Sequence, residues 1–306
     1  MRLRLALVLS LTACACSSSC ARSKPAVVPA ALKFERLPVA EGTAVLVGAG
    51  DVTHCSALEG ARATTALLER LEGTVFVLGD GSNDQGSPVQ YRECFADTWG
   101  RFRDRIRPTP GNHDYFTDGA AGYYGFYGEA AGAADRGYYS YQHCGWHVVV
   151  LNGNCSKVGG CQRGSAQEQW LRADLAAHPA KCTIAYWHQP RFSSGRHGSD
   201  ARTGDLWRAL HEAGAELVLS GHDHHYERFA PLDPFGRPDP ERGIRQFIAG
   251  TGGAGLRTVG SPVDGSEVRI AGRHGVLRLA LRDGAYDWQF ISIEGETLDS
   301  GTGACH

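Results

Sequence analysis

Aspartate, asparagine and histidine gather in five short segments of this 306-residue chain, and four of these segments directly follow apolar runs. The last, at residues 221–225, contains three histidines within four positions. The candidate metal ligands in these segments are Asp51, Asp80, Asn112, His188, His222 and His224. Oxygen and imidazole ligands together suit transition-type metals, and they suit neither calcium nor a structural thiolate zinc site. The sequence therefore predicts a site for two metal ions.

The apolar runs explain how distant residues could meet. Runs rich in Val, Ile and Leu predict strands buried on both faces, at residues 43–51, 74–80, 181–188 and 215–224. Helical patterns alternate with them, at residues 61–73, 165–178 and 203–214. This alternation predicts parallel strands, whose carboxyl ends share one edge of a sheet. We therefore expect the metal-type residues to lie close together.

After residue 243 the pattern changes. Period-two alternation with glycine-containing turns predicts antiparallel strands, at residues 244–250, 275–284, 285–295 and 296–301. The chain is thus expected to combine parallel and antiparallel pairing.

The series GD, GD, GNHD, WH and GHDH, in this order between Gly50 and His224, resembles the calcineurin-like metallophosphoesterases, and most closely their purple acid phosphatase branch. The resemblance implies an α/β fold, a four-layer αββα sandwich of two mixed β-sheets flanked by helices. It also implies hydrolysis of phosphomonoesters, as in acid phosphatases, by a hydroxide bound to two metal ions. A phosphodiesterase of the same fold and a non-catalytic phosphate-binding surface protein are the alternatives.

The resemblance also implies a role for each residue. The first metal would be held by Asp51 and His224, both metals by the bridging Asp80, and the second metal by Asn112, His188 and His222. His113 would stand near the leaving group and give it a proton, with Asp114 as its orienting partner.

Two family ligands are missing. Purple acid phosphatases carry a tyrosine three positions after the bridging aspartate, where this chain has Asn83. The wider superfamily has a histidine two positions after the first aspartate, where this chain has Thr53. A neutral amide cannot stabilise a ferric ion as a phenolate does. We therefore expect two divalent ions (Fe, Mn or Zn) and no purple colour, with Asn83 as a metal ligand or a neighbour of one.

Three further histidines are weaker candidates. His54, beside Thr53, is either a substitute ligand or a loop histidine that faces solvent. His225 is either a neighbour of the ligands or a surface residue, and His197 either reaches the substrate phosphate or belongs to an ordinary loop. The aromatic segment at residues 114–128 either lines a substrate mouth or packs as a loop layer.

The N-terminus predicts export. Residues 1–13 contain two arginines and then a short apolar stretch, as in a signal peptide, and residues 11–14 resemble the lipobox of bacterial lipoproteins. We expect a signal peptide at 1–13, a tether at 14–40 beginning with a lipidated Cys14, and a catalytic domain at 41–306. The protein would lie in the cell envelope, with contact to a membrane only through this anchor; the alternative is a secreted protein cut near Cys20.

The net charge of the chain excludes one class of partner. A net charge of −2 without a block of like charge does not provide a nucleic-acid binding surface.

Seven cysteines lie beyond the tether, namely Cys55, Cys94, Cys144, Cys155, Cys161, Cys182 and Cys305. Export favours disulfides, and Cys155 and Cys161 flank a glycine-containing loop that could close on itself. Because seven is odd, at least one thiol is free or paired outside this set.

Overall fold

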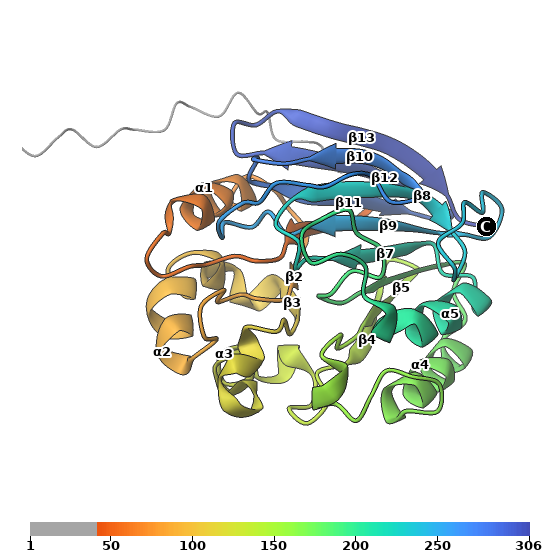
Figure 1. Cartoon of the computed structure of the whole chain (residues 1–306), viewed down its shortest axis with the longest axis horizontal. Helices are drawn as coiled ribbons and strands as arrows, with labels where there is room; N and C mark the ends of the chain where they lie inside the picture. The colour runs from red at the N-terminus through yellow and green to blue at the C-terminus, as the bar shows by residue number, and fades with distance from the viewer. Residues whose placement is uncertain (1–41) are drawn as a thin grey trace, which may run out of the picture. The chain divides into compact units, whose positions relative to one another are not determined.

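The computed structural model of the chain describes residues 42–306 (Figure 1). The predicted signal peptide, the tether and the lipidated Cys14 lie outside these residues. Within the described part, no helix combines the length and the apolar character needed to cross a membrane.

One sheet has six strands, in the order β13-β12-β11-β1-β2-β3. Their bounds are β1 (Ala44–Ala49), β2 (Thr74–Leu78), β3 (Ile106–Thr109), β11 (Gly275–Arg282), β12 (Ala285–Ser292) and β13 (Thr297–Ala304). Strands β1, β2 and β3 pair in parallel, and the other pairings are antiparallel. The sheet is therefore mixed, as expected.

The other sheet has seven strands, in the order β10-β8-β9-β7-β6-β5-β4. Their bounds are β4 (Tyr139–His143), β5 (Trp146–Val150), β6 (Cys182–Tyr186), β7 (Leu217–Ser220), β8 (Tyr226–Leu232), β9 (Ile244–Ala249) and β10 (Ser266–Ile270). Strands β5, β6, β7 and β9 run parallel to one another. The prediction for residues 244–250 is therefore only half right, because β9 pairs antiparallel with β8 but parallel with β7.

Helices cover the sheets, which confirms the four-layer αββα sandwich (Figure 1). The α-helices are α1 (Glu59–Leu68), α2 (Pro88–Gln90), α3 (Ala121–Tyr127), α4 (Ala166–Ala177) and α5 (Gly204–Glu212). A π-helical turn spans Tyr91–Phe95, and 3-10 turns span Trp99–Arg105, Asp114–Phe116, Asp118–Ala120, Gly128–Ala131, Cys155–Lys157 and Ala201–Thr203. Helices α4 and α5 pack on the outer face of the seven-stranded sheet, where Leu171 and Leu210 join Val149 and Val218 in one apolar cluster.

The alternate residues of the same strands face the other sheet. Ile184 and Leu219 of the seven-stranded sheet share a second cluster with Leu46 and Leu279 of the six-stranded sheet. Burial on both faces explains why the central strands are almost continuously apolar in sequence. The two sheets thus enclose the main core, and their carboxyl-end loops meet at one edge.

Three disulfides link the described residues. The predicted local bridge Cys155–Cys161 forms, and the other two are Cys55–Cys94 and Cys182–Cys305. The last joins β6 to the residue that follows β13, and so ties one sheet to the other. Cys144 is free and exposed, which accounts for the odd number. Disulfides are typical of proteins that fold in an oxidising compartment, and they fit an exported chain.

Candidate metal centre

Six predicted ligands lie just beyond the carboxyl ends of five strands. Two strands, β1 and β2, are followed by Asp51 and Asp80, and β3 by Asn112; in the other sheet, β6 is followed by His188 and β7 by His222 and His224. Ligand atoms of Asp51, Asp80 and His188 lie within 4.8 Å of one another. The centre is therefore built where the two sheets meet, with ligands from both.

Four of these side chains converge on one point. His188 Nε2 lies 3.2 Å from Asp80 Oδ2, 3.1 Å from Asn112 Oδ1 and 3.2 Å from His222 Nδ1. The other ring nitrogen, His188 Nδ1, donates to the Leu78 carbonyl at 2.6 Å. This second bond is the arrangement that orients metal-binding histidines, because it leaves Nε2 to face the metal.

The second group is arranged in the same way. His224 Nε2 lies 3.2 Å from Asp51 Oδ1, and His224 Nδ1 donates to the Gly255 carbonyl at 2.6 Å. Asn83 lies between the two carboxylates, since its Nδ2 is 3.1 Å from Asp80 Oδ2 and 3.4 Å from Asp51 Oδ1. Asn83 thus belongs to the centre, at the place where the family tyrosine is missing.

The backbone around the centre is strained and closely packed. Asp51, Asp80 and His222 have positive φ values of 58°, 51° and 69°, which residues other than glycine rarely adopt. At Gly111 a Cβ atom would stand 2.0 Å from Asp80 Oδ1, so only glycine lets that carboxylate occupy its place. Strain of this kind is concentrated at functional sites.

Burial and mutual attraction shift the acidities of the ligands. Burial alone would lower the pKa of His188, but attraction to Asp80 outweighs it and raises the pKa to about 10. Burial and the neighbouring His188 lower the pKa of His222 to about 4. Burial would raise the pKa of Asp51, yet His224 holds it well below its usual range. Without a metal, the histidines thus supply the positive charge that the carboxylates need.

A metal ion fits this donor set. Among the described residues, neither Asp51 nor Asp80 has an arginine or lysine partner, so only histidines neutralise these buried carboxylates. Buried carboxylates require a counter-charge. A divalent cation would replace the proton that His188 holds at the centre, and metal binding commonly competes with protons in this way.

His113 faces the centre, but Asp114 does not orient it. His113 Nδ1 donates to the Asp84 carbonyl at 2.7 Å, and His113 Nε2 lies 3.9 Å from Asp80 Oδ2. The carboxylate of Asp114 instead accepts from Tyr91 Oη at 2.6 Å and from the Gly111 amide at 2.8 Å. The predicted pairing is therefore wrong, because neighbours in this tight turn point in different directions. Burial and repulsion by Asp80 raise the pKa of Asp114 to about 7.

Two of the weaker candidates point away from the ligands. His54 Nε2 pairs with Asp84 at 3.1 Å, and 44% of its side chain is exposed, so it is a loop histidine in this structure. His225 is buried and its Nε2 lies 3.0 Å from Glu227 Oε2. Glu227 also accepts from Ser194, so His225 supports the loop that carries Ser194 rather than the centre itself.

His197 does reach the centre. Its ring lies 4.3 Å from the ring of His222, and its Nε2 lies 2.7 Å from an Arg257 guanidinium nitrogen. Burial, partly opposed by Asp223, lowers the pKa of His197. The Arg257 backbone amide donates to the His224 carbonyl at 3.1 Å. Arg257 was not predicted from the sequence, because the alternation at residues 244–250 predicts only antiparallel pairing. A parallel β9 would have indicated that the segment following it reaches this edge.

Comparisons with known proteins show to which family the chain belongs. Residues 34–226, more than half of the chain, match the family model described as calcineurin-like phosphoesterase. The chain belongs to this family. It is 25% identical to purple acid phosphatase 18 of Arabidopsis thaliana over 175 residues, which are 50% of this chain and 39% of the relative. It is 28% identical to acid phosphatase A of Cryphonectria parasitica over 151 residues, 44% of this chain and 30% of the relative. The chain therefore spans well under half the length of these relatives.

Solved structures show the same fold. A purple acid phosphatase from yellow lupin seeds (Lupinus luteus) superimposes with a TM-score of 0.69 at 18% identity, over 86% of this chain and 54% of the lupin chain. GAP50, described as the anchor in the inner membrane complex of Plasmodium, superimposes with a TM-score of 0.65 at 15% identity, over 86% of this chain and 89% of that chain. Within its family, the chain is therefore purple acid phosphatase-like in sequence and in fold.

Proposed function

We propose that this protein is a metal-dependent hydrolase of phosphomonoesters. The observation that carries the proposal is the convergence of imidazole, carboxylate and amide donors on two adjacent points, without a lysine or arginine partner for Asp51 or Asp80 among the described residues. Two buried carboxylates would repel a phosphate in the absence of a metal, whereas this donor set suits metal cations. Similarity to purple acid phosphatases supports the same reaction class.

Six residues would hold two divalent ions, which we propose to be iron, manganese or zinc. The first ion would bind Asp51 and His224, the second Asn112, His188 and His222, and Asp80 would bridge them. When bound, such a pair supplies Lewis acidity to a phosphoryl group and acidifies a water. Asn83, whose amide already lies between the two carboxylates, is neutral and so favours divalent over ferric iron.

His113 is the residue that would protonate the leaving group. Its Nδ1 proton is committed to the Asp84 carbonyl, so Nε2 is the nitrogen that faces the centre. A protonated ring could therefore donate from Nε2 to the departing alkoxide. The Asp84 carbonyl, and not Asp114, holds the ring in this orientation.

His197 and Arg257 would bind the phosphoryl oxygens. The His197 ring lies beside His222, and Arg257 contacts His197 through its side chain and the His224 carbonyl through its amide. Arg257 has no carboxylate partner within the described part of the chain. A guanidinium close to the metal ions would stabilise negative charge that develops on the phosphoryl group. The bond from Arg257 to His197 keeps both side chains at that side of the centre.

Hydrolysis of a chromogenic monoester and of the matching diester, after loading with manganese, zinc or iron in turn, tests the proposal. We expect metal-dependent turnover of the monoester. Preferred turnover of the diester would replace the proposal with a phosphodiesterase. If neither ester is cleaved with any metal while phosphate still binds, the protein is a non-catalytic phosphate-binding protein.

We also propose that the protein is exported and anchored at Cys14, and that residues 41–306 form the catalytic domain. Lipidation at Cys14 predicts that a fatty-acid label is incorporated and that the protein fractionates with membranes. A Cys14→Ser variant that keeps both properties would contradict the anchor.

A further inference from the structure

A cavity of about 280 Å³ opens directly beside the metal centre. Two of the centre's residues, Asn112 and His222, line this cavity. Tyr115 and Phe116 contribute aromatic surface, and the cations Lys157 and Arg202 also line the cavity. A cavity of this size is at the small end of the range for ligand pockets, so it suits the organic part of a small ester.

The cavity lies on the side of the leaving group. The ring of Phe116 is 4.6 Å from the ring of His113, the residue proposed to protonate the departing oxygen. A phosphoryl group at the metal ions, with its ester oxygen toward His113, would therefore direct the alcohol toward Phe116 and into this cavity. The residues that line it would then select among alcohols.

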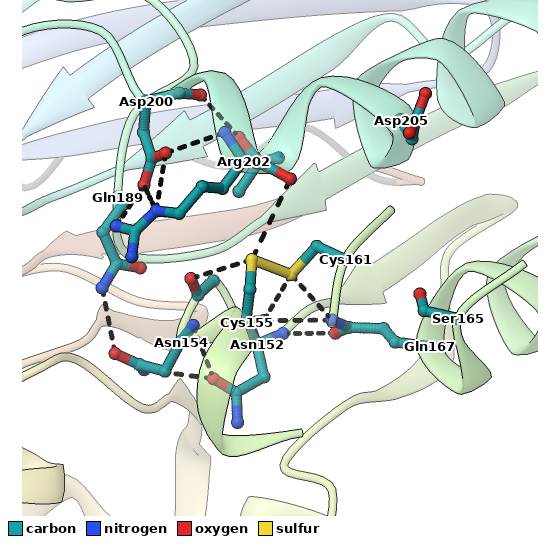
Figure 2. The surroundings of a disulfide bond; sticks show 12 residues. Asn152, Asn154, Cys155, Cys161, Ser165, Gln167, Gln189, Asp200, Arg202 and Asp205 are labelled. Atoms are coloured by element: carbon teal, nitrogen blue, oxygen red, sulfur yellow. Dashed lines mark hydrogen bonds and ion pairs between the residues drawn. A yellow bond between two sulfur atoms is a disulfide. The ribbon is translucent and has the colours of Figure 1, made fainter. Parts of the chain in front are cut away.

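The loop that carries Lys157 is held by a disulfide and by backbone hydrogen bonds. The Cys155–Cys161 disulfide closes the loop, and the Lys157 amide donates to the Asn154 carbonyl at 2.8 Å. Figure 2 shows the surrounding network, in which Asn154 is bonded to Gln189 and the disulfide stands beside Gln167. The position of the Lys157 backbone is thus defined before any ligand binds.

The two cations of the cavity differ in how far their charge is neutralised. Arg202 forms hydrogen bonds to Asp200 through Nε at 2.9 Å and through a terminal nitrogen at 2.6 Å, as Figure 2 shows. Lys157 has no ion pair within the described residues, and its ammonium lies 5.9 Å from the Tyr115 ring centroid. No residue that lines the cavity is acidic. The cavity therefore carries an uncompensated positive charge at Lys157.

We propose that this cavity binds the leaving group and that Lys157 recognises a second acidic group on it. The inference rests on the proposed phosphomonoester hydrolysis. The preferred substrates would be small phosphomonoesters whose alcohol carries a carboxylate or a second phosphate. Tyr115 and Phe116 would pack on the carbon chain, while the metal ions hold the scissile phosphoryl group.

Three esters with the same carbon chain test this assignment: propyl phosphate, its analogue with a terminal carboxylate, and its analogue with a terminal phosphate. We expect Lys157→Gln to raise the KM of both acidic esters about fivefold, as for a partly exposed ion pair, and to leave propyl phosphate unchanged. The effect should decrease with added salt. A larger effect on the terminal phosphate than on the carboxylate would identify a second phosphate as the preferred group. An equal effect on the two acidic esters would show that Lys157 recognises a single negative charge of either kind.

Lys181→Gln is the matched control. Lys181 lies just before β6, at the amino end of that strand and so away from the metal centre, and it pairs with Asp283 at 3.3 Å. This variant should leave the KM of all three esters unchanged. If Lys157→Gln changed all three esters equally, or none of them, the proposal would be overturned.

Calorimetric binding of propylphosphonate and of the corresponding diphosphonate to the manganese-loaded protein decides the proposal even without turnover. Tighter binding of the diphosphonate that disappears in Lys157→Gln supports the cavity assignment, whatever the outcome for hydrolysis. Equal binding of the two phosphonates by the unchanged protein would overturn it. Absence of turnover in the ester assay counts only against the proposed function.

Discussion

Two regions of this molecule bring histidines and an aspartate together, with opposite results. One is the metal centre. The other, which we call the α4 cluster, contains His147, Asp174 and His178, whose potential ligand atoms also lie within 4.8 Å of one another. In the α4 cluster His147 Nε2 lies 2.7 Å from Asp174 Oδ2, and Ser140 donates to Asp174 Oδ1 at 2.7 Å. The cluster thus satisfies its carboxylate with hydrogen-bond donors.

The metal centre lacks this balance. Around His188 Nε2 stand an Asp80 oxygen, the Asn112 oxygen and the His222 nitrogen, so one proton would have to serve several acceptors. The second nitrogen of His188 is already bonded to a backbone carbonyl. Proximity of ligand-type residues is therefore not what distinguishes the two regions. The difference is whether donors and acceptors are matched, and only the unmatched set needs a cation.

The largest expected effect comes from the carboxylate at the middle of the centre. Asp80→Asn should reduce turnover by at least about a thousandfold, because the residue proposed to bridge the two metal ions would lose its negative charge. Metal content, measured by mass spectrometry of the purified protein, should fall in parallel. A variant that kept both near-normal turnover and two metals would contradict the ligand assignment.

His113 should affect the reaction without affecting metal binding. His113→Gln is expected to reduce kcat for an alkyl phosphate by about a hundredfold or more, since the proposed proton donor would be lost. Esters with acidic leaving groups should lose much less, because they need no proton. His54→Gln is the matched control: this histidine pairs with Asp84 away from the ligands and should leave kcat unchanged. An equal loss for both ester types would show that His113 is not the proton donor.

The α4 cluster should show the opposite pattern. Asp174→Asn is expected to lower the free energy of unfolding by about 1–3 kcal/mol, because His147 and Ser140 lose a charged acceptor. Turnover and metal content should not change. Urea unfolding and metal analysis of the same preparation measure both. Loss of a metal ion from this variant would show that the α4 cluster is itself a metal site, and the comparison would fail.

A third carboxylate sharpens the comparison, because a permanent cation neutralises it. Asp299 accepts from Arg228 Nε at 2.8 Å and from Tyr226 Oη at 2.6 Å, and so joins β13 to β8. Burial would raise the pKa of Asp299, but the bonds from Arg228 and Tyr226 lower it below its ordinary value. The stabilisation is therefore complete above the unfolded pKa of about 3.9 and is lost as the pH falls through the lowered folded pKa.

Asp299→Asn should accordingly destabilise the protein by about 1–2 kcal/mol at about pH 7 and by less at about pH 3. Urea unfolding of the unchanged protein and the variant at both pH values measures the difference. An equal difference at the two pH values would show that the charge of Asp299 does not contribute.

Much of the centre could be predicted from the sequence, because its logic is local. An apolar run of strand length followed by a ligand-type residue specifies which residues stand at a strand's carboxyl end, and parallel strands bring those ends to one edge. This reasoning indicated Asp51, Asp80, His188, His222 and His224. Asn112 was indicated only by the GNHD segment and the family resemblance, because the sequence before it, which forms β3, is not an apolar run. The short spacing of Cys155 and Cys161 likewise indicated their disulfide.

Other features depended on contacts between distant segments. The parallel pairing of β9 with β7, and with it the position of Arg257, follows from neighbours that no local period specifies. The direction of a side chain within a turn is also beyond local spacing: Asp114 follows His113 directly, yet it points to Tyr91. By itself, the sequence determined which residues reach the edge where the sheets meet, because strand period and strand ends are local properties. Only the tertiary structure decided which acceptors face one another there and where a cavity remains, because these depend on how separate loops pack.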